Sequence, residues 1–338
     1  MNDWKLARTA VVASLAMVAI DRPLAQDLHR FPVIRGDYLG ESLPGAVPVL
    51  FAPGMASTDL HDDWPPIFTP DGNEVLLRVV GPTRDGRVVG ALVHAIREGG
   101  VWQPPEPLWF SNEFLDVEGF LALSRDGSRL YVSTARAAWT ADGDDPDRDI
   151  WCFERADSVW SEPTRLDSNI NSDLHDLVTS VGTDETLYFD RQPRSGEFFS
   201  RTYYAKPDGA GGYHDPVELT DFAGPVRFQK VLIAHDDSYL IMTGARPTGD
   251  LDLYVSFGAS DGAWGKPINL ESVNSVRSDK FPGLSPDGLF LFFASRRTPA
   301  DQTPGRFWDI PEILSAPKGD QVDVYWVSTE VIERLRPR

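Results

Sequence analysis

Ser285-Pro286-Asp287-Gly288-Leu289-Phe290-Leu291-Phe292-Phe293 is a tight-turn sequence followed at once by an apolar, β-prone run. Asp-Gly between two apolar runs predicts a β-hairpin, because the central residues of such a turn need positive φ. A turn followed by an apolar run occurs four more times, at residues 70–77, 125–132, 182–189 and 235–242. Equivalent positions lie 51 to 57 residues apart, which predicts a repeat protein of five units.

Each unit carries two further strand patterns after the hairpin. One is a polar residue followed by apolar and aromatic residues, as in Asp149-Ile150-Trp151 and Asp252-Leu253-Tyr254. The other is an aromatic residue, a proline and then an aliphatic residue, as in the run from Trp160 to Leu166. Because proline is tolerated at sheet edges, this last run is expected to be an outer strand. Four short antiparallel strands per repeat are typical of a propeller blade.

The repeats therefore predict an all-β fold, a β-propeller of five four-stranded blades. Six blades remain possible if residues 28–55 form more of a blade. The fifth unit lacks the proline strand, and Pro48-Val49-Leu50-Phe51 can supply a strand in its place. The N- and C-terminal segments are then expected to close the ring, which removes a free sheet edge.

The N-terminal segment has the features of a secretory signal. Lys5 and Arg8 precede an apolar run of about twelve residues, too short to span a bilayer, and Ala25 offers a cleavage point. We expect a signal peptide at residues 1–25, an extension at residues 26–37 and one propeller domain at residues 38–338. The mature protein is then periplasmic or secreted, and no later segment is expected to cross a membrane.

The net charge of the 338-residue chain is −19. Such a surface repels phosphate backbones, so nucleic acid is not an expected partner. Polyanionic glycans are also disfavoured, unless a local cluster of Arg or a metal reverses the field. The single cysteine, Cys152, rules out a disulfide within the chain and lies in a strand-like run, where it is expected to act as a small buried hydrophobe.

The motifs quoted above resemble one known family. The turn at Ser285 to Gly288, the preceding Asn274-Ser275, the Asp-Ile-Trp and Asp-Leu-Tyr strands and the opening Tyr38-Leu39-Gly40 are similar to those of the TolB-like Pro-Asp-repeat, or WD40-like, β-propellers. The resemblance covers roughly residues 38–336 and implies the fold, since one fold hosts many activities. TolB itself has an additional N-terminal α/β domain for which this chain has no room, so a role in the Tol–Pal envelope system does not carry over. Related propellers include a metal-dependent lyase of oligogalacturonate.

The mouth of the central channel is the expected ligand site of a propeller. Counting back from the equivalent apolar position of each repeat places one residue per blade at this mouth: Asp63, Glu118, His175, Phe228 and Asp279. A second set lies two positions further back: His61, Asp116, Asp173, Val226 and Arg277. Most members of both sets are ionisable.

Two chemical interpretations of this ring involve a metal or catalysis. His61, His175 and Asp63 are candidate ligands of a divalent cation, for which an oxygen-rich ring favours calcium and a mixed His and Asp set favours manganese or zinc. Asp63, Glu118 and Asp279 are candidate acid and base groups for a glycosidic bond, with their separation deciding the stereochemistry.

A third interpretation is simple binding. The ring, with Arg277 at its edge, would bind a polar ligand or a loop of a partner, and Trp308 in the insertion at residues 296–320 would stack on a glycan. The competing interpretation is structural: these groups cap neighbouring strands and pair across blades. Arg246 and Arg297, which occupy equivalent positions, are expected to pair with the Asp that opens the next strand, such as Asp252.

The sequence contains no self-sufficient catalytic motif. Our leading hypothesis is an exported, monomeric propeller without enzymatic activity that binds a protein, a cell-envelope component or a small polar ligand at the channel mouth. The alternative is a secreted carbohydrate-active enzyme, a glycoside hydrolase or a metal-dependent lyase, that uses the channel carboxylates and histidines.

Overall fold

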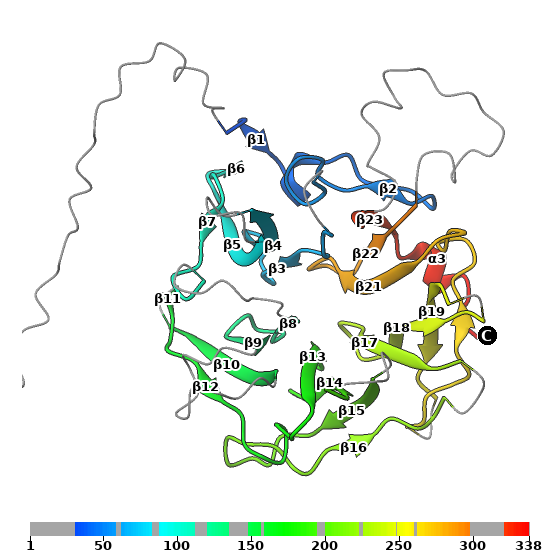
Figure 1. Ribbon diagram of the computed structural model, residues 1–338. Coiled ribbons are helices and arrows are strands. Elements are labelled where there is room, and N and C mark those ends of the chain that lie inside the picture. Colours follow the sequence, from blue (N-terminus) through cyan, green and yellow to red (C-terminus); the bar gives the residue numbers. More distant parts are fainter. Residues whose placement is uncertain are drawn as a thin grey trace, which may run out of the picture. The chain divides into compact units, whose positions relative to one another are not determined.

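Five β-hairpins, one at each repeat, form the inner halves of five antiparallel sheets. Figure 1 shows these sheets as the blades of a ring around a central axis, so the predicted five-bladed propeller is confirmed. The computed structural model describes the following residues: 31–58, 62–82, 88–111, 120–134, 148–156, 159–194, 200–222, 226–247, 249–259, 262–297 and 321–337.

The blades follow one another along the chain. From the innermost to the outermost strand, blade 1 has β3 (Ile67–Phe68), β4 (Glu74–Pro82), β5 (Val88–Glu98) and β7 (Glu106–Pro107). In the same direction, blade 2 has β8 (Leu121–Leu123), β9 (Arg129–Thr134), β10 (Asp149–Ala156) and β12 (Thr164–Arg165). Blade 3 has β13 (His175–Val181), β14 (Leu187–Gln192), β15 (Arg201–Ala205) and β16 (Val217–Glu218).

Blade 4 has β17 (Phe228–Ile233), β18 (Tyr239–Ala245), β19 (Leu251–Phe257) and β20 (Ile268–Asn269). Blade 5 has β21 (Asp279–Leu284), β22 (Phe290–Ser295), β23 (Asp323–Ser328) and β2 (Val49–Leu50). Short strands extend two blades: β1 (Ile34–Arg35) pairs with β6 (Val101–Trp102) beside blade 1, and β11 (Val159–Trp160) pairs with β10 in blade 2. Four outer strands follow prolines in the sequence, as predicted.

The hairpin turns are held by their own side chains. In blade 5 the hydroxyl of Ser285 donates to Asp287 Oδ1 at 2.6 Å, and the same oxygen accepts the Leu289 N–H at 3.0 Å. Gly288 sits at φ +71°, a region that glycine occupies without strain. Blades 1 and 2 repeat the hydroxyl–aspartate bond, so the repeated Asp-Gly sequence encodes one repeated turn.

Blade 3 departs from this turn by one residue. Its Gly182 N–H donates to Thr186 O, whereas Ser285 N–H in blade 5 reaches one residue further along the chain to Phe290 O. Glu185 takes the positive-φ position that glycine holds in the intact copies, with φ at +61°. The blade 3 turn is therefore one residue shorter, which shifts the numbering of equivalent positions in β13.

The ring closes through the N-terminal strand β2, which pairs with β23 in the register Val49 to Trp326. Phe51 and Trp326 are fully buried at this seam, with ring centroids 5.0 Å apart. Tyr38, in the 3-10 turn η1 (Tyr38–Gly40), donates its hydroxyl to Asp287 Oδ2 at 2.6 Å. Closure by both terminal segments, expected from the sequence, is confirmed.

Repeated tryptophans pack inside the blades, since Trp102 and Trp160 are buried. The predicted pairing of Arg246 with Asp252 is confirmed by an Nε–Oδ1 distance of 3.4 Å. The same prediction is wrong for Arg297, which pairs with Asp279 of the innermost strand at 2.7 Å. Asp279 is fully buried beside it, so the nearest strong acceptor of the guanidinium lies inward rather than on the next strand.

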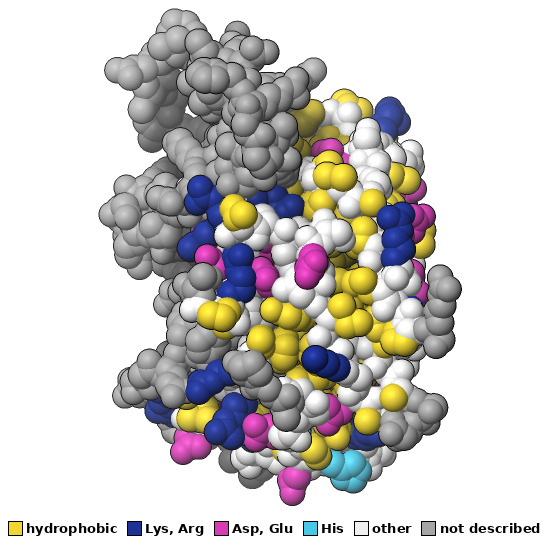
Figure 2. All heavy atoms as spheres, turned by 90° about the vertical axis from the view of Figure 1, so that its right-hand side faces the viewer, with side chains coloured by type: hydrophobic (Ala, Val, Ile, Leu, Met, Phe, Trp, Pro, Cys, Tyr) yellow, Lys and Arg dark blue, Asp and Glu magenta, His cyan; other side chains and the backbone are white. Residues whose placement is uncertain are grey.

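The outer surface is mixed in character. On the side of the domain that faces the viewer in Figure 2, Lys and Arg side chains are interspersed with Asp and Glu, so neither sign forms a continuous field there. Among the parts of the chain that the structure describes, no helix has the length and apolar character that a membrane crossing requires. Cys152 is half-buried, and burial raises the pKa of its thiol to about 12, so it stays protonated and unreactive.

Candidate functional site

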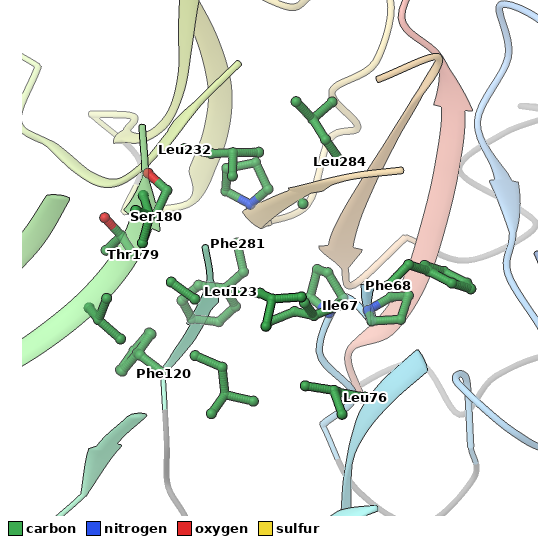
Figure 3. A pocket seen from close by; sticks show the side chains of 18 of the residues that line it. Ile67, Phe68, Leu76, Phe120, Leu123, Thr179, Ser180, Leu232, Phe281 and Leu284 are labelled. Atoms are coloured by element: carbon green, nitrogen blue, oxygen red, sulfur yellow. The ribbon is translucent and has the colours of Figure 1, made fainter. Parts of the chain in front are cut away.

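The innermost strands surround a cavity of about 190 Å³ along the propeller axis, which we call the channel cavity. Its walls are largely apolar, and Figure 3 shows Ile67, Leu123, Leu232 and Leu284 arranged around the central space. Thr179 and Ser180 also line it, but the Ser180 hydroxyl already donates to Val231 O and accepts from a backbone N–H. The cavity therefore offers an apolar interior with few free polar groups.

Three aromatic rings lie at the end of the cavity where the inner strands begin, and we call them the aromatic layer. Trp64 stacks on Phe281 with ring centroids 4.3 Å apart and an interplanar angle of 14°. Phe120 meets Trp64 edge-on at 4.8 Å. Each ring carries a cation: Arg78 over Trp64 at 4.9 Å, Lys230 over Phe120 at 4.0 Å and Lys280 over Phe281 at 4.9 Å.

Backbone bulges direct the side chains of Lys230 and Phe281 toward the channel cavity. The pairing of β17 with β18 and of β21 with β22 shifts register at Gln229 to Leu232 and at Lys280 to Gly283. Inside these shifts, Lys230 has φ +56° and Phe281 has φ +54°. A bulge inserts an extra residue and breaks the alternation of faces along a strand. Lys230 and Phe281 consequently line the channel cavity, although period-two counting would place Phe281 on the same face as Asp279.

Lys230 is held by a buried carboxylate of the neighbouring blade. Its Nζ lies 3.0 Å from Asp190 Oδ2, and its backbone N–H donates to the same oxygen. Asp190 also accepts the hydroxyls of Ser200 and Thr202. Burial lowers the pKa of Lys230, and the Asp190 charge opposes this change. The pair is thus a complete ion pair that fixes blade 4 against blade 3.

The opposite end of the cavity is formed by the hairpin turns. Pro70, Arg125, His235 and Pro286 occupy the same turn position in four blades, and we call them the turn layer. Arg125 of blade 2 donates from Nη2 to the backbone carbonyls of Ile233 (2.7 Å) and Ala234 in blade 4. Because blade 3 lies between these blades, the guanidinium reaches across the end of the channel.

His235 is neutral at pH 7. Burial lowers the pKa of its imidazole to about 4, and the charge of Arg125 lowers it further. A backbone hydrogen bond to Pro286 opposes the shift. Among the lining residues that the structure describes, the ionisable ones are all of basic type: Arg78, Arg125, Lys230 and His235. Lys230 is neutralised by Asp190 and His235 is uncharged, so Arg78 and Arg125 are the cations that distinguish this lining from a chain of net charge −19.

Two of the three predicted carboxylates, Asp279 and Asp63, are buried and do not line this cavity. Asp279 is fully buried and accepts the Ser275 N–H at 2.5 Å, the Ser295 hydroxyl and the Arg297 guanidinium. Asp63 is also buried and accepts the backbone N–H of Thr58 at 2.5 Å. Neither carboxylate is among the described residues that line the channel cavity.

In blade 3 the equivalent of these carboxylates is Asp176, not His175. Asp176 is fully buried, accepts the Ser172 N–H at 2.7 Å and pairs with Arg191 at 3.0 Å. The turn of blade 3 is one residue shorter than the others, so the position predicted from the repeat spacing falls on His175, one residue before Asp176. One sequence signal identifies Asp176 as the equivalent residue. Asn171-Ser172 stands before Asp176 at the same spacing as Asn274-Ser275 before Asp279, with the serine four residues ahead of the aspartate.

The other described candidates do not converge on the cavity. His175 accepts the Arg148 N–H at Nδ1 over 3.2 Å, and burial together with the Arg148 charge lowers its pKa. Phe228 packs edge-on against Phe222 and Tyr254. Arg277 and Asp173 lie on the connections that enter β21 and β13. Four further candidates lie outside the described residues: His61, Asp116, Glu118 and Trp308.

A metal site remains a prediction. Within the described ranges, no three His, Cys, Asp or Glu side chains are grouped closely enough to hold an ion. His61, one of the three predicted ligands, lies beyond those ranges, and His175 and Asp63 are engaged as described above.

Asp63 makes a testable contribution to pH dependence. Burial raises the pKa of its carboxyl to about 7, the charges of Asp323 and Asp62 add to the rise, and hydrogen bonds from Thr58 oppose it. The unfolded chain releases this proton near pH 4, whereas the folded protein keeps it until about pH 7. The free energy of unfolding should therefore fall as pH rises through this window.

Asp63→Asn should flatten the pH profile of stability by about 2–4 kcal/mol between pH 4 and 8, because a rise of about three pKa units at about 1.4 kcal/mol each sets the upper end and partial exposure to solvent lowers it. Urea denaturation at unit pH steps measures this. Asp215→Asn, at an exposed carboxylate of an outer loop, is the matched control and should keep the wild-type slope. An Asp63→Asn profile as steep as that of the wild type would contradict the assignment.

No protein-family model matches the sequence, and no curated protein matches it in a sequence comparison. Solved structures with a similar fold include a TolB-type protein of Agrobacterium tumefaciens, at 18% identity and a TM-score of 0.44, covering 68% of each chain. TolB of Acinetobacter baumannii shares 15% identity at a TM-score of 0.46, covering 69% of this chain and 48% of that one. The catalytic domain of a GH62 α-L-arabinofuranosidase from Coprinopsis cinerea shares 10% identity at 0.45, covering 84% and 98%. At these levels the likenesses assign no function.

Proposed function

We propose that this propeller is a binding protein and that the channel cavity is its ligand site. The observation that carries the proposal is a largely apolar cavity of about 190 Å³ with an aromatic layer at one end and a turn layer at the other. Apolar cavities of roughly 150 Å³ accept molecules the size of benzene. Ligand sites are typically concave, largely apolar and furnished with a few polar groups, which describes this space.

Binding is better supported than glycoside hydrolysis. Hydrolysis needs two carboxyl groups facing one space, usually about 5–10 Å apart. Among the described residues no Asp or Glu lines the channel cavity, and Asp279 and Asp176 are already paired with arginines. The enzymatic alternative would depend on Glu118 and on the residues beyond the described ranges.

Export to the periplasm or the cell exterior belongs to the same proposal. It rests on the apolar run that follows Lys5 and Arg8 and on Ala25. In that compartment the ligand would be a small molecule or a group of a cell-envelope component or partner protein, and a monomer suffices because the cavity lies within one chain.

Filling the cavity should abolish binding without unfolding the protein. Leu284→Phe adds volume at a residue that lines the cavity, whereas Leu289→Phe makes the same change at a side chain that is 57% exposed on the adjacent turn. Methyl NMR of Leu123, Leu232 and Leu284, with millimolar benzoate or benzamide as probe, reports occupancy. We expect the probe to change the methyl chemical shifts of these leucines in the wild type and in Leu289→Phe. In Leu284→Phe the methyl shifts of Leu123 and Leu232 should not change.

The proposal fails if neither probe shifts these methyl groups in the wild type. It also fails if Leu284→Phe, shown by its denaturation curve to be folded, responds to the probes as the wild type does.

A further inference from the structure

Arg125 differs from the other buried cations around the channel. Arg297 pairs with Asp279, and Lys230 pairs with Asp190. The guanidinium of Arg125 donates only to two backbone carbonyls, and its Nε is buried without a hydrogen-bond partner. It forms no ion pair within the described part of the chain. Arg125 thus brings a positive charge to the channel cavity that no described carboxylate contacts.

The charges of Asp237 and Asp236 act favourably on the partly buried guanidinium, but neither carboxylate forms an ion pair with it. Removing a charge from water is costly, and arginine cannot avoid the cost by releasing a proton. Backbone carbonyls compensate part of it, because they accept hydrogen bonds but carry only partial charge. An anion beside the part of the guanidinium that lines the cavity would provide a full opposite charge. Such a charge-assisted hydrogen bond is stronger than one between neutral groups.

The surroundings of Arg125 restrict the kind of anion. His235, in the equivalent turn position of blade 4, is neutral at pH 7, so Arg125 is the one cation of the turn layer. The carboxylates of Asp236 and Asp237 act on Arg125 from the blade 4 turn, which favours a ligand of low charge. The net charge of −19 repels multiply charged ligands more strongly than singly charged ones. Beyond the turn layer the walls are formed by Leu123, Leu232 and Leu284, which suit an apolar body.

We propose that the channel cavity binds a small organic monoanion, a carboxylate on an aromatic or short aliphatic body, and that Arg125 binds its carboxylate. This inference rests on the proposed function and adds the chemical class of the ligand. The carboxylate accepts hydrogen bonds from the guanidinium at the turn layer, and the body extends between the leucines toward the aromatic layer.

Isothermal titration calorimetry with benzoate and benzamide tests the charge, because the two probes have nearly the same shape. We expect wild-type protein to bind benzoate on the order of 10- to 100-fold more tightly, the range of one hydrogen bond to a buried charge. Hexanoate and hexanamide should show the same preference. Arg125→Gln should remove it by weakening the acid and leaving the amide nearly unchanged.

Arg129→Gln is the matched control, because Arg129 belongs to the same hairpin but lies outside the cavity with its side chain 42% exposed. It should keep the wild-type preference. If Arg125→Gln does not fold, Arg125→Lys carries the test: it keeps the charge, so benzoate should still bind more tightly than benzamide, by a smaller factor.

Equal affinities for acid and amide in the wild type would overturn the anion proposal while leaving the channel as a ligand site. A full preference for benzoate in Arg125→Gln would also overturn it. Absence of binding by either probe would defeat the proposed function itself.

Discussion

Replacing Trp326 by alanine should lower the free energy of unfolding by about 3–5 kcal/mol, the range for deleting a large buried aromatic side chain. Trp326 is fully buried on β23, directly opposite Val49 of β2. Its ring stacks on Phe292 at 5.6 Å with an interplanar angle of 4° and meets Phe51 edge-on at 5.0 Å. The substitution therefore opens a cavity at the one place where the ring is closed by distant parts of the chain.

Urea denaturation followed by circular dichroism measures this loss. Trp109→Ala is the control, since the side chain of Trp109 is 40% exposed on an outer connection and its removal leaves no comparable void. We expect a clearly smaller loss for it. Equal losses for the two variants would show that closure of the ring does not depend on the packing of Trp326.

Asp279→Ala should lower the free energy of unfolding by a similar amount, about 3–5 kcal/mol, because it leaves a buried charge without its partner. Arg297 is almost fully buried, and its Nη2 lies 2.7 Å from Asp279 Oδ1. The same carboxylate accepts the Ser275 N–H and the Ser295 hydroxyl. Asp279→Asn keeps an acceptor for these donors and should cost less.

Glu330→Ala is the matched control for this change. Glu330 pairs with Arg334 at 3.3 Å, but its side chain is 74% exposed, and exposed pairs contribute roughly 0–1 kcal/mol. Thermal or urea denaturation of the three variants gives the comparison. A negligible effect of Asp279→Ala on the free energy of unfolding would contradict the structural role of this carboxylate and favour a functional one.

The architecture was predictable from the sequence because the repeated turns encode it locally. Asp287 and Gly288 each have a defined part in the turn, one as acceptor and one at positive φ, and both recur in other blades. The closing strand at Val49–Leu50 was predictable for a complementary reason, since the fifth repeat lacked an outer strand and one spare apolar segment remained.

The site was less predictable, because the features that decide it break the repeat. The bulges that turn Lys230 and Phe281 into the channel have no signature in a period-two pattern. Because the turn of blade 3 is one residue shorter, counting along the repeat reaches His175 instead of the equivalent residue, Asp176. The cation at the turn layer, Arg125, stands where the Pro-Asp-Gly copies of the turn have proline, and in the sequence this difference looks like ordinary variation between repeats.

The pairing of β2 with β23 also sets the order of events during synthesis. Val49 and Phe51 are synthesised long before Trp326, so the last blade cannot be completed until the whole chain is available for folding. Until then the earlier blades form an open arc with unpaired edges, and contacts of such sequence separation form slowly. Chaperones that shield strand edges should therefore raise the yield of folded protein.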